Sequence, residues 1–217
     1  MDSIGIIGQG FVGNAIYQKF KNYYKVLTYD LDSGKCNSTE EETMGCDIIF
    51  VCLPTPMNAM GECDISIVDE AIAGISNLGK ASSVVIKSTI VPGTYSKLIT
   101  YFDKERLCLV PEFLREKHAV EDFIWNHNVL VIGTEYTNAY NLVIKSHGHF
   151  PKEVKVITPY ECEFVKYFSN SFKAYKTVFA NSFGKLCDKH NVDYSNVLDI
   201  YRAEEVKETA YLRYFNE

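Results

Sequence analysis

The chain has 217 residues, of which 47% are hydrophobic and 13% aromatic, enough to bury the core of a globular protein. Its formal net charge is -6 and its lysines and arginines are scattered, which argues against a nucleic-acid-binding surface. The seven cysteines form no CxxC pair, which favours a reducing cytoplasmic setting, and no apolar run approaches the ~18 residues of a membrane span.

Short apolar runs rich in β-branched residues alternate with stretches of helical length in the first two thirds of the chain. The runs are Ile4–Ile7, Val26–Tyr29, Asp47–Leu53, Ser83–Lys87, Leu107–Val110 and Val129–Ile132. The expected helices between them include 12–21, 66–78 with Ser66 as N-cap, and 94–101. This alternation predicts an α/β fold, a Rossmann-like, doubly wound and mostly parallel sheet.

The pattern changes after Gly133. We expect a helix over 138–146, an edge strand over 154–157, a long helix over 160–189 and a last helix over 195–201. Thr158 and Glu161 flank Pro159 as a capping box, which predicts the start of the long helix. We therefore divide the chain into a dinucleotide-binding domain, 1–150, and a helical region, 151–217.

A glycine-rich segment follows the first apolar run. Gly8, Gly10 and Gly13 in GQGFVG have the spacing that allows a tight turn, the approach of a pyrophosphate and close helix packing. Asp30 ends the second run, where its carboxylate can accept from a ribose 2′-hydroxyl and would repel a 2′-phosphate. The segment therefore predicts NAD as the cofactor, with Lys35 facing the adenosine side.

Four further motifs follow in chain order. They are CLPTP (52–56), KSTIVPGT (87–94), PEFLREKHAVEDF (111–123) and ECEFVKYFSNSFKAYK (161–176). Because ligands bind outside the carboxyl ends of strands in open α/β sheets, the loops after the third, fourth and fifth runs should share one rim. Together with GQGFVG, these motifs resemble the UDP-glucose/GDP-mannose dehydrogenase family, in particular its members that oxidise UDP-glucose.

The resemblance implies a double NAD-dependent oxidation of a sugar alcohol to a carboxylate through a cysteine-bound intermediate. It implies a nucleotide-sugar substrate and a role in nucleotide-sugar metabolism and polysaccharide biosynthesis. The catalytic residues carried over by motif are Thr89, Glu112, Glu116, Lys166 and Asn170. Thr89 would hold a water, one of the two glutamates would help activate water, Lys166 would stabilise the oxyanion, and Asn170 would orient the sugar.

The resemblance also assigns binding residues. Those for the cofactor are Gly8, Gly10, Phe11, Val12, Gly13, Asp30, Lys35, Thr55, Thr89 and Glu116. Those for the substrate are Glu112, Phe113, Leu114, Arg115, Lys166 and Asn170. The long helix carries its phenylalanines on one face and its polar residues on the other, and family members dimerise through this helix, so a homodimer is expected.

Simpler interpretations compete with these roles. Glu112 and Glu116 have the spacing of a solvated first helical turn, Lys166 and Asn170 that of an exposed pair, and Thr55 between two prolines can simply shape a turn. The two histidines His147 and His149 lack the further ligands that a metal site needs, so we expect them at the surface and expect no metal.

The chain also departs from the family. Its last residues approach, but do not reach, the GGxCxPKD segment that carries the family's nucleophilic thiol, and Lys117, His118 and Asn128 replace common family residues. One interpretation is a nucleotide-sugar dehydrogenase truncated before that cysteine and without the C-terminal UDP-binding domain. The alternatives are a short, non-catalytic dinucleotide-binding or dimerisation module, a GDP-mannose or UDP-N-acetylhexosamine dehydrogenase, or a member of the wider 3-hydroxyacid dehydrogenase group, which PEFLRE disfavours.

Overall fold

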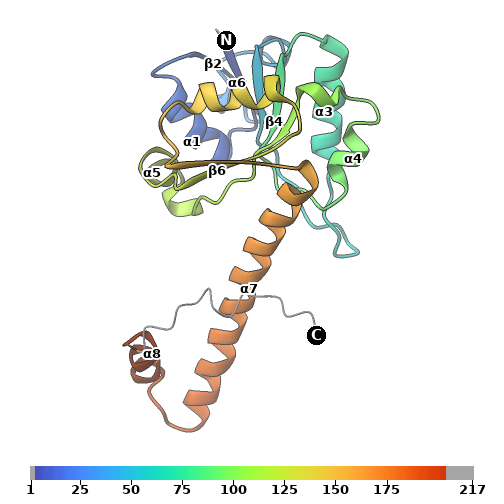
Figure 1. The fold of residues 1–217 in the computed structure, drawn as a ribbon. Coiled ribbons are helices and arrows are strands. Elements are labelled where there is room, and N and C mark those ends of the chain that lie inside the picture. Colours follow the sequence, from blue (N-terminus) through green and yellow to red (C-terminus); the bar gives the residue numbers. More distant parts are fainter. Residues whose placement is uncertain (1–2, 204–217) are drawn as a thin grey trace. The chain divides into compact units, whose positions relative to one another are not determined.

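The computed structural model describes residues 3–203, and a seven-stranded sheet lies at its centre (Figure 1). The strand order is β2-β1-β3-β4-β5-β6-β7. All neighbours pair in parallel except β5 and β6, which are antiparallel. The strands are β1 (Ser3–Ile7), β2 (Lys25–Tyr29), β3 (Ile48–Val51), β4 (Ser83–Ile86), β5 (Leu107–Leu109), β6 (Val129–Gly133) and β7 (Glu153–Ile157). The predicted doubly wound, mostly parallel sheet is confirmed.

Helices cover both faces of this sheet. They are α1 (Phe11–Phe20), α2 (Glu40–Met44), α3 (Ser66–Leu78), α4 (Thr94–Leu98), α5 (Ala119–Trp125) and α6 (Thr137–His147), with short 3-10 turns η1 (Ser33–Lys35), η2 (Lys104–Arg106) and η3 (Glu116–His118). Helices α1, α5 and α6 share one buried cluster, and α2, α3 and α4 share the other. The result is a three-layer arrangement with the sheet in the middle.

Alternation along the strands explains why two cores form. Ile4 and Ile6 of β1 belong to the cluster under α1, whereas Ile7 belongs to the cluster under α3. The register repeats this across β3, where Ile48 lies opposite Ile4 and Val51 lies opposite Ile7. Because successive side chains point to opposite faces, strands that are apolar throughout can fill both layers.

Three local predictions differ from the structure. The N-cap of α3 is Ile65 and not Ser66, because the carboxylate of Asp64 accepts from the Ser66 N–H at 2.9 Å and the helix starts at Ser66 itself. The helices α2 and α5 were not expected, since each is shorter than the window over which periodicity is recognisable. The third difference, the burial of His147, concerns the surroundings of the site and is described below.

The long helix α7 (Pro159–Lys189) starts as expected. The Thr158 N–H donates to the Glu161 carboxylate at 3.0 Å, and the Glu161 N–H donates to the Thr158 hydroxyl at 3.3 Å, which completes the capping box. The chain forms two compact units, which divide at Phe168 and Ser169 within this helix. The first unit contains the sheet and the first part of α7.

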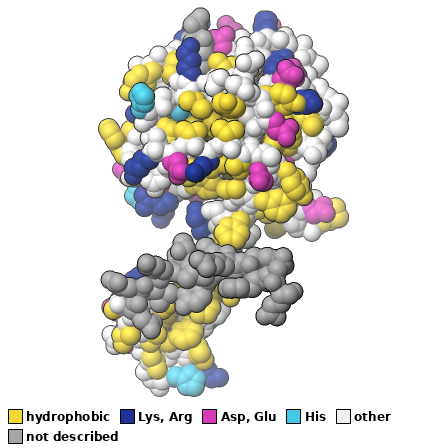
Figure 2. Space-filling model, viewed as in Figure 1, with side chains coloured by type: hydrophobic (Ala, Val, Ile, Leu, Met, Phe, Trp, Pro, Cys, Tyr) yellow, Lys and Arg dark blue, Asp and Glu magenta, His cyan; other side chains and the backbone are white. Residues whose placement is uncertain are grey.

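The second unit contains the rest of α7 and α8 (Tyr194–Ala203). Its two helices are linked through Tyr194, whose ring lies 6.4 Å from that of Phe183, and through the buried Cys187, whose carbonyl accepts from the Val192 N–H at 2.9 Å. Figure 2 shows apolar side chains at the surface of both units. Within residues 3–203, no helix has the length and apolar content needed to cross a membrane.

Candidate functional site

The glycine-rich loop between β1 and α1 has the shape that the sequence predicts. Gly8 has a φ of 92°, and a Cβ there would lie 2.5 Å from the carbonyl oxygen of Cys52. A Cβ on Gly13 would lie 1.9 Å from the carbonyl oxygen of Gly8, so α1 packs close against the loop. Gly10 is the N-cap of α1, and a Cβ there would meet nothing within 4 Å. The loop thus leaves open space in front of a helix N-terminus, where a pyrophosphate binds favourably.

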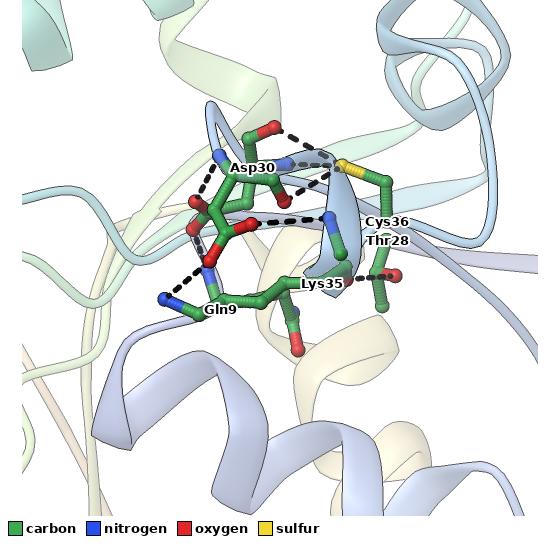
Figure 3. A network of polar contacts seen from close by, with 7 residues as sticks. Gln9, Thr28, Asp30, Lys35 and Cys36 are labelled. Carbon is green, nitrogen blue, oxygen red and sulfur yellow. Dashed lines mark hydrogen bonds and ion pairs between the residues drawn. The ribbon is translucent and has the colours of Figure 1, made fainter.

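Asp30, at the end of β2, is tied to this loop (Figure 3). Its carboxylate accepts from the Gln9 N–H at 2.6 Å and from the Asp32 N–H at 2.9 Å. Cys36 holds the Asp30 backbone, since its thiol accepts from the Asp30 N–H and donates to the Asp30 carbonyl. Burial acts to raise the pKa of Asp30, but the two N–H groups outweigh it and lower that pKa. The carboxylate is therefore ionised and can accept a ribose hydroxyl.

Lys35 lies near Asp30, and its charge helps to lower the pKa of that carboxylate. Its carbonyl accepts from the Thr28 hydroxyl at 3.2 Å, and its ammonium group lies 3.4 Å from the carboxylate of Asp32 (Figure 3). Both side chains of this ion pair are more than half exposed, so the pair contributes little to stability. Lys35 is consequently able to exchange its partner for a ligand.

The loops after β3 and β4 are joined to each other. The Thr55 hydroxyl donates to the Thr89 carbonyl at 2.7 Å, and the Leu53 N–H donates to the Ser88 hydroxyl at 2.9 Å. Thr55 thus does shape the turn between its prolines. It also lines a cavity together with Thr89, so the two interpretations of this residue are compatible.

This cavity, of about 1010 Å³, runs along the carboxyl ends of the first five strands. It is of a size that holds a drug-sized ligand or cofactor. The predicted site residues that line it are Gly8, Gly10, Phe11, Val12, Asp30, Lys35, Thr55, Thr89, Glu112, Leu114 and Lys166. Strand ends far apart in the sequence thus meet at one rim, as the parallel topology requires. No cluster of three potential metal ligands occurs within residues 3–203.

Glu112 and Lys166 meet in the wall of the cavity. The ammonium group of Lys166 donates to the Glu112 carbonyl and lies 5.5 Å from the centre of the Phe113 ring. The carboxylate of Glu112 is buried and lies 2.7 Å from the ammonium group of Lys87. Two ammonium groups and one carboxylate therefore lie together at the point where β4, β5 and α7 meet.

Helix α7 is fixed to the sheet by the residues just before Lys166. Glu163, which is 2% exposed, accepts from the Tyr95 and Gly93 N–H groups, both at 2.7 Å. Cys162 is buried against Gly133, and a Cβ on that glycine would lie 2.4 Å from its Cβ. The carboxylate of Glu163 therefore serves the N-terminus of α4.

Other predicted residues lie away from the large cavity. Glu116 is exposed at the start of η3 and lines a second cavity of about 220 Å³, which Phe11 also lines. Arg115 binds the carboxylate of Asp122 through two nitrogens, at 2.7 and 2.9 Å. Asn170 is exposed and belongs to the second compact unit, where its role stays a prediction.

His147 is not at the surface. It is fully buried at the end of α6, with its ring 5.3 Å from Phe20 and 5.8 Å from His127, and its Nδ1 shares a hydrogen bond of 2.9 Å with the Val143 carbonyl. Burial lowers its pKa well below the ordinary value for a histidine. His149, two residues on, is exposed as expected.

Lys87 was missed by the analysis of the sequence. It is 3% exposed, lines the large cavity and pairs with Glu112. The available signal is its position: a lysine that directly follows the buried strand β4 and precedes a loop at the ligand rim is an unusual buried charge. Burial of its neighbour Cys52 raises the pKa of that thiol to about 12, so Cys52 is a thiol and not a thiolate at neutral pH.

The sequence of this chain matches two domains of a known protein family. Residues 25–150 match the NAD binding domain of the UDP-glucose/GDP-mannose dehydrogenase family, and residues 160–214 match its central domain. A UDP-glucose 6-dehydrogenase of Rickettsia bellii (strain RML369-C) is 34% identical over 165 residues, which is 72% of this chain and 38% of that protein. UDP-glucose 6-dehydrogenase TuaD of Bacillus subtilis (strain 168) is 27% identical over 92% of this chain and 52% of that protein. The chain thus spans from two fifths to about half of the length of these curated relatives.

Solved structures agree with this match. The UDP-glucose dehydrogenase of Pyrobaculum islandicum matches with a TM-score of 0.81 and 27% identity, and the match covers 96% of this chain and 57% of that protein's chain. The GDP-mannose dehydrogenase of Pseudomonas aeruginosa has a TM-score of 0.82 at 22% identity, over 97% of this chain and 59% of its own, which shows a shared fold. The chain has an NAD binding domain and belongs to the UDP-glucose/GDP-mannose dehydrogenase family.

Proposed function

We propose that this chain supplies the NAD-binding and lysine-bearing parts of an enzyme that oxidises the primary alcohol of UDP-glucose to the carboxylate of UDP-glucuronate. The observation that carries this proposal is the cavity of about 1010 Å³, whose wall contains Asp30 and the glycine-rich loop together with Thr89 and Lys166. A cofactor bound on the loop and a sugar bound at the lysine would share this space. The named activities of the relatives support the same reaction class.

The fit of NAD follows from the residues on the cofactor side. Gly10 leaves open space at the N-terminus of α1, and Asp30 is an ionised acceptor next to it. An ionised carboxylate favours a ribose hydroxyl over a 2′-phosphate, which selects NAD over NADP. NAD, when bound, accepts the hydride of each oxidation.

On the substrate side, we assign Lys166 to the negative charge that develops on the sugar oxygen. A partly buried ammonium group placed by α7 is worth more to an oxyanion than one in water, because it needs less reorganisation during the reaction. Thr89 would hold a water near the sugar, and Asn170 would orient the sugar. One of the glutamates of PEFLRE would activate water for the second half of the reaction.

We further infer that the chain divides in function into a cofactor domain, 1–150, and a helical dimerisation region, 151–217. One face of α7 exposes apolar side chains: Phe164 is 50% exposed, Phe168 59%, Tyr175 67% and Phe179 57%. Such a stripe in a chain of this charge fits a homodimer with a second copy, in a cytoplasmic setting. Sedimentation at micromolar concentration tests this, and Phe179→Ser should shift any dimer towards monomer.

The second candidate is an NAD-binding module without catalysis. It is favoured by Cys52, the cysteine that lines the cavity, because its pKa of about 12 leaves no thiolate to capture an aldehyde. GDP-mannose and UDP-N-acetylhexosamines are the alternative substrates of the enzyme.

Calorimetry and turnover separate these functions. NAD should bind and NADP should bind at least tenfold more weakly; no affinity for NAD would remove both candidates. Two NADH per UDP-glucuronate formed would support the dehydrogenase. NAD binding without NADH from UDP-glucose, GDP-mannose or UDP-N-acetylhexosamine would favour the module.

A further inference from the structure

A buried ion pair forms part of the wall of the large cavity. Lys87 follows β4 and Glu112 follows β5, and these strands are neighbours in the sheet. Their side chains are 0% and 7% exposed, and Lys87 Nζ lies 2.7 Å from Glu112 Oε2. Among the described residues neither atom makes a hydrogen bond to any other group, so the two charges neutralise each other. Because burying two charges costs free energy, a buried pair in the wall of a cavity suggests that the pair has a role there.

Glu112 connects this pair to Lys166. Its Oε1 accepts from the N–H of the next residue, Phe113, at 3.0 Å, so the side chain fixes its own backbone. The carbonyl of the same residue accepts from the Lys166 ammonium, which also lies over the Phe113 ring. The orientation of Lys166 therefore depends on a backbone that Glu112 holds in place.

We propose that Lys87 is a positioning residue, which retains Glu112 as its fixed counter-ion so that the Glu112 carbonyl and the Phe113 ring hold Lys166 at the cavity. This inference rests on the proposed function for the role of Lys166.

The surroundings of Glu112 support this assignment. The charged and titratable groups around it are Lys87 after β4, His127 after α5, Cys52 after β3 and Lys166 on α7. Burial acts to raise the pKa of Glu112, but the Lys87 ammonium, His127 and the Phe113 N–H together lower it. Glu112 is therefore ionised at neutral pH, as its pairing with Lys87 requires.

The test replaces the lysine by a neutral residue of similar shape, Lys87→Met, in the 217-residue chain. Carbon-13 NMR of protein with labelled glutamate follows the protonation of the Glu112 carboxyl group as the pH is lowered. The Glu112→Gln variant identifies the Glu112 signal, because that signal is absent from its spectrum. In the unchanged protein the carboxylate should stay ionised below the ordinary midpoint of ~4.3. In Lys87→Met the midpoint should rise by at least one pH unit, and Lys166 should react at least threefold faster with acetic anhydride.

Further variants complete the test. Lys97→Met removes a lysine from an exposed pair with Asp69 and should change neither readout. Lys87→Met/Glu112→Gln removes both buried charges, while the amide oxygen of the introduced side chain can still accept from the Phe113 N–H, so Lys166 should react at the rate of the unchanged protein. If the single variant does not fold, a comparison of two double variants decides. Lys166 that is protected in Lys87→Met/Glu112→Gln but at least threefold more reactive in Lys87→Met/Glu112→Ala, which has no acceptor for the Phe113 N–H, supports the proposal.

Opposite outcomes would overturn it. The first is a folded Lys87→Met variant in which the pH midpoint of Glu112 protonation, or the rate of Lys166 with acetic anhydride, is unchanged. The second is a Lys87→Met/Glu112→Gln variant in which Lys166 reacts as fast as an exposed lysine. Neither readout needs NAD or turnover. Failure to bind NAD would therefore reject the proposed function, whereas these results would reject only the positioning role.

Discussion

The carboxylate of Asp30 accepts a hydrogen bond of 2.6 Å from the backbone N–H of Gln9, which joins the end of β2 to the glycine-rich loop after β1. The two residues are 21 positions apart in the sequence. The acid that we propose selects the cofactor and the loop that we propose receives its phosphates are therefore joined directly. A change at Asp30 should affect both.

Asp30→Ala should weaken NAD binding at least tenfold and narrow the preference for NAD over NADP. The variant loses the acceptor for the ribose, the repulsion of a 2′-phosphate and the tie to Gln9. Calorimetry with both cofactors measures this. The control is Asp188→Asn, an exposed carboxylate in the second unit. Equal losses for NAD and NADP would show that Asp30 acts on the loop alone.

Gly10→Ala and Gly13→Ala form a matched pair with opposite consequences. A Cβ on Gly10 meets nothing within 4 Å, so this variant should fold with a loss of less than about 1 kcal/mol and yet bind NAD at least tenfold more weakly. A Cβ on Gly13 lies 1.9 Å from the Gly8 carbonyl oxygen, so this variant should lose more than about 2 kcal/mol of unfolding free energy. Urea unfolding and calorimetry test both. A stable Gly13→Ala variant would contradict the close packing of α1.

Cys52 should be inert towards iodoacetamide at pH 7.5. Its pKa of about 12 leaves a negligible fraction of thiolate, although the residue lines the cavity. Mass spectrometry should find Cys52 unmodified in the native protein and modified in urea, and Cys52→Ser should retain NAD affinity within threefold. Rapid native modification of Cys52 would restore it as a candidate nucleophile.

His147 should make the free energy of unfolding depend on pH below ~6.5. Burial lowers the pKa of His147 in the folded protein. Below pH ~6.5 the histidine is therefore protonated in the unfolded chain but stays neutral in the folded protein, which favours unfolding. Its contribution is therefore present above that pH and is lost as the pH falls. The loss is at most about 1.4 kcal/mol for each pH unit, until the folded pKa is reached.

The comparison of His147→Gln with His149→Gln tests this. Urea unfolding at several pH values should give a flatter pH dependence for the variant at the buried site than for the one at the exposed neighbour. If both variants keep the full pH dependence, the titrating group lies elsewhere, with His127 the next to test because burial lowers its pKa too.

Local patterns in the sequence were sufficient for most of the helices and strands and for the glycine-rich loop with Asp30. Strand, glycine-rich turn, helix and the acid of Asp30 follow one another within thirty residues, and each has a local physical cause. The same holds for the capping box at Thr158 and for the alternating runs that predict a parallel sheet. These features need only backbone conformation, periodicity and short-range hydrogen bonds.

The burial and pairing of charges could be decided only by the tertiary structure. Lys166 and Glu112 are 54 positions apart, and Glu163 reaches Gly93 across 70. No local pattern distinguishes the Glu112 carboxylate paired with Lys87 from a solvated one, or a buried His147 from an exposed His149. The reason is that the free energy of a charge depends on solvent and partners, and the packing of distant strands and helices determines both.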